Sequence, residues 1–227
     1  MTKNEKIFIP LTSRSVKCIL GSMAVLGRTK KDVLLEFRTT EILDAARTVF
    51  ASKGFDGATI DAIALSAGVA KGTVYLYFDS KRDLFLASLR EGVLALHAEV
   101  AAEMAAAETV EAKLHAFISG RFQYFSRNRE FFRIYYTEFS HLITGTANAQ
   151  PEFQDLYEQQ AVLLETVLAD GVISGQLREF DVPKTARLIY DLIRAALAQH
   201  ILHGAGEAPD APVRTLFDFV WKGIGTK

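Results

Sequence analysis

Residues 59–81 have the sequence TIDAIALSAGVAKGTVYLYFDSK, and this stretch decides the fold of the N-terminal part of the chain. Thr59 is a favourable N-cap for a helix whose inward positions are Ile60, Ile63, Ala64 and Ala67. Gly68 supplies the backbone freedom that a tight turn requires, and a second short helix is expected from about residue 70 to residue 78. Two short helices joined by such a turn predict a helix-turn-helix.

The flanking sequence predicts one helix on each side of this pair. From Thr39 onward, apolar residues recur at helical spacing, and Gly54 is suited to end that helix; the apolar positions are Ile42, Ala46, Val49 and Phe50. On the other side, Ser80 and Asp83 form a capping arrangement for a long helix that continues through Leu89. The head is therefore expected to hold three helices and the start of a fourth.

Charge is divided unevenly along the chain. Residues 1–90 carry 14 Lys and Arg against nine Asp and Glu, whereas residues 91–227 carry 12 against 18. The second helix of a helix-turn-helix enters the major groove of DNA, and here it has no acidic residue between positions 70 and 78. It offers Lys71, Thr73 and two phenolic hydroxyls, and Lys81 follows at the start of the next helix. Only the basic front is expected to meet a polyanion.

Residues 36–85 resemble the DNA-binding domain of the TetR family of bacterial transcriptional regulators. The matching residues include Ile42-Leu43-Asp44-Ala45-Ala46, Phe50, Gly54-Phe55, Ile63-Ala64, Ala67-Gly68-Val69, Val74, Phe78 and Ser80. The resemblance implies a homodimeric repressor that reads a palindromic operator in double-stranded DNA. It also implies these DNA contacts: Thr59, Lys71, Gly72, Thr73, Tyr75, Tyr77 and Lys81. Residues 27–31 resemble the basic arm that many members carry, and Ala70 departs from the Ser or Thr that is common before Lys71.

Residues 91–227 show helical stripes and no alternating strand pattern, so the whole chain is expected to be all-α. We expect a basic extension over residues 1–35, a DNA-binding domain over residues 36–96, and a helical domain over residues 97–227. The last of these would bind an effector and form the dimer.

Aromatic residues are concentrated in one part of the acidic half. Nine of the chain's 24 aromatic residues lie within residues 117–139. Such a cluster is either a bulky core or the lining of an apolar ligand cavity. The resemblance favours the cavity, because that region holds the effector in many family members. The expected ligand contacts are Phe117, Phe125, Phe132, Tyr136, Phe139 and His141.

The last two expected helices each carry a continuous apolar stripe. A terminal helix of this kind covers its own core or meets a second copy of the chain, and the resemblance favours a symmetric four-helix dimer interface. The expected interface residues are Ile189, Leu192, Ile193, Ala196, Leu216, Phe217, Val220 and Trp221.

Other classes of protein have little support in the sequence. There is no G-x-S-x-G elbow, phosphate-binding glycine loop or complete G-x-G-x-x-G, so we expect neither an enzyme nor a bound cofactor. Glu138-x-x-His141 occurs once and Cys18 is the single cysteine, so no metal site is expected. No apolar run is long enough to span a membrane, so we do not expect an integral membrane protein. The single cysteine, Cys18, fits the reducing cytoplasm, where we expect the protein to be located.

Two questions stay open at this level. The start of translation is either Met1 or Met23, and the alternative to an effector-released repressor is a DNA-binding or nucleoid-type protein without an effector. The identity of the effector, the operator sequence, and the choice between repression and activation are not encoded in a recognisable pattern.

Overall fold

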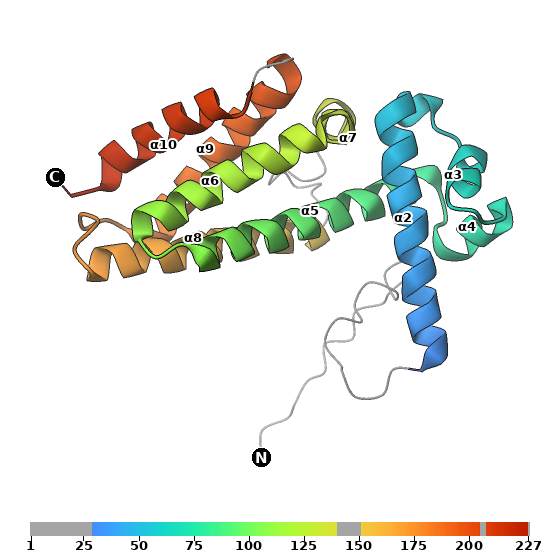
Figure 1. Cartoon of the computed structure of the whole chain (residues 1–227), viewed down its shortest axis with the longest axis horizontal. Helices are drawn as coiled ribbons and strands as arrows, with labels where there is room; N and C mark the ends of the chain where they lie inside the picture. The colour runs from blue at the N-terminus through green and yellow to red at the C-terminus, as the bar shows by residue number, and fades with distance from the viewer. Residues whose placement is uncertain (1–28, 140–150, 205–207, 227) are drawn as a thin grey trace. The chain divides into compact units, whose positions relative to one another are not determined.

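The computed structural model describes residues 29–139, 151–204 and 208–226 (Figure 1). In chain order the helices are α2 (Lys30–Gly57), α3 (Ile60–Ser66), α4 (Lys71–Tyr77), α5 (Lys81–Ala106), α6 (Val110–Arg127), α7 (Arg129–Ile134), the π-helix η2 (Tyr135–Phe139), α8 (Pro151–Ile173), α9 (Val182–His203) and α10 (Asp210–Ile224). Within the described residues the β-type pairing is an isolated bridge between Leu177 and Gly225. The expected all-α class is confirmed.

The chain divides into two compact units, residues 1–88 and residues 89–227, and the division falls within α5. In the first unit, the apolar positions that predicted α2 are buried, and three rings join them. Phe50 meets the Phe85 ring edge-on at 5.1 Å between centroids and stacks on Phe55 at 5.8 Å. These contacts fix the end of α2 against the start of α5.

Helix α2 begins at Lys30, nine residues before the periodic pattern that predicted it. Its first turns carry Leu34 and Phe37, whose exposed fractions are 58% and 57%, so this part of the helix has no buried stripe that a periodicity argument would detect. At the other end, Gly54 has φ of +71° and kinks the chain, and one further turn extends α2 to Gly57.

In the second unit, α6 is central because it contacts α8, α9 and α10, and α9 also packs against α8 and α10 (Figure 1). The C-terminal segment is tied to the α8–α9 connection, since Arg178 N–H donates to the Ile224 carbonyl at 3.0 Å and Thr226 N–H donates to the Gln176 carbonyl at 3.1 Å. In the described part of the chain, no helix combines the length and apolar character needed to cross a membrane.

Candidate nucleic-acid interface and effector site

The turn between α3 and α4 has the geometry that its sequence predicts. The Thr59 hydroxyl accepts a hydrogen bond from the Ala62 N–H at 3.1 Å and so caps α3. Gly68 adopts φ of +65°, a region that favours glycine, and Val69 N–H donates to the Ala64 carbonyl at 3.0 Å. Ala70 is the N-cap of α4 and provides no side-chain hydrogen bond there, as its methyl group dictates.

Helix α4 is held from beneath by Val74, which is fully buried, and by Phe78, which follows its last turn. The opposite face is open, with 49% of Tyr75 and 71% of Leu76 exposed. Leu76 was not among the expected contacts. The signal was present in the sequence, because a residue two positions after a buried helical residue points to the opposite side of the helix.

The residues of α4 that we expected to contact DNA lie on this open face and at its edges. Lys71, Gly72 and Tyr75 are exposed, whereas Thr73 and Tyr77 are half-buried at its margin. Gly72 is notable because a Cβ built on it would meet no atom within 4 Å. Packing within the protein therefore gives no reason for glycine at this helical position, where it is less stable than alanine by about 1 kcal/mol.

Lys71 is free to change partner on binding. Its Nζ donates to the Asp61 carboxylate at 2.7 Å, and both side chains are more than half exposed. This hydrogen bond raises the pKa of Lys71. An exposed ion pair contributes little to stability, so the ammonium can turn from Asp61 to a phosphate group.

Lys81, for which the sequence predicts a direct phosphate contact, makes three hydrogen bonds within the protein. Its Nζ donates to three carbonyl oxygens at the end of α2: Phe55 at 2.8 Å, Ala58 at 3.1 Å and Asp56 at 3.3 Å. The ammonium also lies 4.6 Å from the centroid of the Phe55 ring. Because an ammonium has three donors, these contacts use all of them. Lys81 thus ties α2 to the N-terminus of α5, which Ser80 caps through the Asp83 N–H.

The aromatic cluster of the second unit is closely packed. Phe125 stacks on Phe132 with centroids 4.1 Å apart, and Tyr136 lies 6.2 Å from Phe125. Phe117 has different neighbours, because its ring faces Tyr190 and the guanidinium of Arg121. The structure therefore brings together three of the expected ligand contacts, Phe125, Phe132 and Tyr136. Phe117 lies outside this group of rings. The side chain of Phe139 and all of His141 lie outside the described residues.

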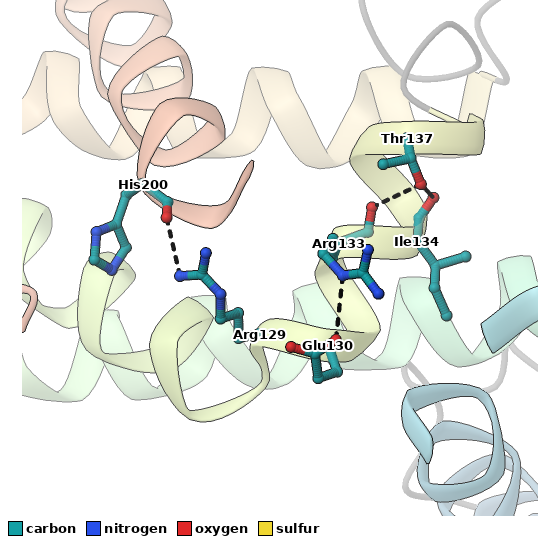
Figure 2. Close-up of polar contacts among 6 residues, drawn as sticks. All are labelled: Arg129, Glu130, Arg133, Ile134, Thr137 and His200. Carbon is teal, nitrogen blue, oxygen red and sulfur yellow. Dashed lines mark hydrogen bonds and ion pairs between the residues drawn. The ribbon is translucent and has the colours of Figure 1, made fainter. Parts of the chain in front are cut away.

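The cluster ends in the π-helix η2, which no sequence pattern indicated. The Thr137 hydroxyl donates to the Arg133 carbonyl at 3.0 Å in this widened turn, and Arg129 of α7 donates to the His200 carbonyl at 2.9 Å (Figure 2). Arg129 also reaches the Gly204 carbonyl at 3.2 Å and so caps the end of α9. Short π-helical segments are frequent at functional sites.

Buried His97 gives this unit a pH-dependent stability. Burial, and then the positive charge of Arg121, lower the pKa of His97 from 6.5 to about 3. Below pH 6.5 the unfolded chain binds a proton that the folded unit does not, so stability is full above pH 6.5 and falls as the pH falls towards 3. We expect a loss of about 1 kcal/mol per pH unit from pH 6.5 to about pH 5.

Urea unfolding followed by the fluorescence of Trp221, the sole tryptophan, measures this effect. His97→Gln should flatten the dependence in that pH range. A slope that is the same in the wild type and in His97→Gln would contradict the assignment.

The expected dimer residues divide into two groups. Ile189, Ile193, Leu216 and Val220 are buried within the protomer. Leu192 is 37% exposed, and Ala196, Phe217 and Trp221 are half-buried. The physical reason is that one apolar stripe on each of α9 and α10 already packs against the helices of the same unit, so an interface would have to use the flank of that stripe.

That flank carries an open groove of about 670 Å³ between α9 and α10. It is lined by Leu192, Ala196, Gln199, His200, His203, Gly204, Ala211, Pro212, Thr215, Leu216 and Phe219. Phe219 is 71% exposed and Leu188 of α9 is 63% exposed. His200 is buried and within 3.0 Å of the Ser126 hydroxyl, whereas His203 is exposed. In the described residues, no group of three or more His, Cys, Asp or Glu is placed to hold a metal ion.

The first unit is thus a helix-turn-helix domain of the kind that binds DNA. Residues 42–88 match the model of the bacterial regulatory proteins of the tetR family. These residues therefore form a DNA-binding domain of the tetR type, and the curated relatives that the chain resembles are transcriptional regulators.

The similarity to known proteins extends beyond the DNA-binding domain. The chain is 29% identical over 160 residues to the transcriptional repressor KstR2 of Rhodococcus jostii, covering 68% of this chain and 75% of that one. It is 24% identical over 164 residues to the fatty acid metabolism regulator protein of Bacillus subtilis, covering 72% and 83%. Among solved structures, FadR of Bacillus subtilis in complex with stearoyl-CoA has a TM-score of 0.69 at 23% identity, covering 82% of this chain and 98% of that chain. The structural similarity shows that this chain shares the fold of FadR over both of its units.

Proposed function

We propose that the protein is a homodimeric cytoplasmic repressor that binds a palindromic operator and is released from it by a small, mainly apolar effector. The observation that carries the DNA-binding part is the orientation of α4. Val74 and Phe78 fix the helix from below, and its other face is open. The relatives named as repressors favour repression over a nucleoid-type role without an effector.

Three residues on the open face of α4 and its margin are assigned partners in the major groove. Lys71 would meet a phosphate or a guanine, and Thr73 a base or phosphate oxygen. Leu76 offers an apolar contact to a thymine methyl group. Thr59 uses its oxygen as the α3 cap, which leaves its O–H able to donate to a phosphate.

The empty space at Gly72 leads to a prediction in which stability and binding change in opposite directions. Gly72→Ala should stabilise the domain by about 0.5–1 kcal/mol, because alanine is the better helix former and its methyl group meets no protein atom. The same methyl group would occupy space that we assign to the DNA backbone, so operator affinity should fall. Thermal unfolding and operator titration measure the two effects. Gly223→Ala in α10, where an added Cβ also meets nothing within 4 Å, is the matched control. Unchanged operator affinity in Gly72→Ala would exclude a close approach of DNA at this position.

The effector is assigned to the second unit, with its apolar body beside Phe125, Phe132 and Tyr136. These rings are in contact with one another, so a ligand would enter by separating them. Relatives described as regulators of fatty acid metabolism, and one bound to stearoyl-CoA, favour an apolar chain as this body. Helix α5 contributes residues to both units, and we assign it the transmission of the signal.

The test begins with operator selection from genomic DNA by the purified protein. Candidate apolar compounds are then titrated with and without the selected operator. Coupling between two sites is reciprocal and typically 5–150-fold, so a true effector should bind more weakly by the same factor when operator is present. Equal affinities in the two titrations would mean that the second unit does not control DNA binding.

A further inference from the structure

Arg121 is a positively charged side chain in the core of the second unit. It is 2% exposed and is among the largest fully buried side chains of the described residues. Its Nη1 donates to the Phe117 carbonyl at 2.7 Å, and its Nη2 donates to Gln160 of α8. The Phe117 ring lies 3.5 Å from its Cζ, and the Tyr190 ring of α9 lies 5.5 Å away.

Within the described residues, the Arg121 guanidinium has no opposite charge beside it. Among the residues that the structure describes, no Asp or Glu lies within ion-pair distance of the guanidinium. Gln160 offers an uncharged amide oxygen, and Tyr190 offers its ring. Burial lowers the pKa of Arg121 to about 10, which leaves it protonated at neutral pH. The cost of desolvating an ion is ordinarily offset by a counter-ion, and here the protein supplies none in its described part.

A second arginine in the same unit has the counter-ion that Arg121 lacks. Arg194 of α9 is paired with the Asp191 carboxylate at 3.4 Å, and about a quarter of its side chain is exposed. Burial disfavours the charged form of Arg194, but nearby Tyr135, Tyr190 and Asp191 together outweigh burial and raise its pKa. Arg121 differs from it in both burial and charge compensation.

The position of Arg121 connects it to the proposed effector site. Phe117, Arg121 and Phe125 are spaced four residues apart on α6 and so lie on one face of that helix. Phe125 in turn stacks on Phe132. Arg121 is therefore one helical turn from Phe125 along α6, and its guanidinium lies beside Phe117 on the same face of the helix.

We propose that Arg121 is the anchor for an anionic group of the effector, so that the effector is an apolar compound with a carboxylate or phosphate head. The inference rests on the proposed function of the second unit. The planar guanidinium binds two oxygens of such a group in parallel, with the anion taking the place of the Gln160 carbonyl oxygen. The ligand then supplies the charge that the protein lacks.

Matched pairs of probes test the head group directly. Dodecanoate and dodecyl phosphate are compared with 1-dodecanol, and 4-phenylbutyrate is compared with 4-phenyl-1-butanol, by isothermal titration calorimetry. We expect the wild type to bind the acids about 10–100-fold more tightly than the alcohols, the range of a hydrogen bond to a charged group. A preference confined to dodecanoate and 4-phenylbutyrate assigns a carboxylate, and one confined to dodecyl phosphate assigns a phosphate.

Arg121→Met should remove this preference while the affinity for the alcohols stays unchanged. Arg127→Met is the matched control, because Arg127 lies on the same helix with 58% of its side chain exposed and should affect neither class. Arg121→Lys keeps the positive charge but lacks the planar guanidinium, so it should retain a reduced preference for acids over alcohols. This variant provides the test if Arg121→Met does not fold. Alcohols that bind as tightly as acids, equal weakening of both classes by Arg121→Met, or no binding of any probe would overturn the proposal.

Operator release by the same probes separates this inference from the proposed function. Release by acids and alcohols alike would support effector control and reject the anion anchor. Binding of acids that depends on Arg121 but leaves operator occupancy unchanged would support the anchor and reject effector control.

Discussion

The double variant Leu192→Glu/Phe219→Glu is expected to be monomeric at micromolar concentration and to bind a palindromic operator at least about 100-fold more weakly than the wild type. Both side chains line the groove between α9 and α10 and are 37% and 71% exposed in the protomer. In a symmetric dimer each new carboxylate would be desolvated opposite a second copy, at a cost of several kcal/mol. A monomer would then engage only one half-site.

The choice of exposed positions makes this result interpretable. Glutamate at the fully buried Ile193 would destabilise the protomer itself, whereas the double variant should unfold at the same denaturant concentration as the wild type. Sedimentation measures the oligomeric state. Ile173→Glu, at an 85% exposed position at the end of α8, is the control and should remain dimeric. A double variant that still sediments as a dimer would place the interface elsewhere.

Lys81→Met is expected to destabilise the DNA-binding unit by about 2 kcal/mol, because three carbonyl oxygens at the end of α2 lose their donor together. Methionine keeps the apolar stem of the side chain, so the change isolates the ammonium. Hydrogen exchange of amides in α2 and α3, together with denaturant unfolding monitored by circular dichroism, measures the effect. Lys53→Met, an exposed lysine of α2, is the control and should change stability by no more than about 0.5 kcal/mol.

The same variant distinguishes the structural role of Lys81 from the direct contact that the sequence suggested. A phosphate contact would leave stability unchanged and would reduce the salt dependence of operator binding by about one unit. A structural tie lowers stability and weakens operator binding through loss of the folded head. Unchanged stability with a reduced salt slope would restore the sequence-based assignment.

The sequence by itself determined the features that depend on near neighbours along the chain. The cap at Thr59 and the capping pair Ser80–Asp83 each join residues three apart, and the positive φ of Gly68 belongs to one residue. The structure has all three features. Helical periodicity is equally local, so it predicted the all-α class. Periodicity missed the first turns of α2 because Leu34 and Phe37 are not buried.

Tertiary structure decided which chemical partner each side chain meets, because those partners lie far apart in sequence. Lys81 donates to carbonyls 23–26 residues earlier in the chain, so the sequence could show a lysine near DNA but not that its donors are used. An apolar stripe predicts that one face of a helix is buried, but it does not predict which element covers that face. Only packing separates Ile193, which meets its own core, from Leu192 beside it, which meets the groove. Arg121 is the clearest case, since a charged residue in a helix is ordinarily solvated, and its burial against α8 and α9 follows from the assembly of three helices rather than from any local pattern.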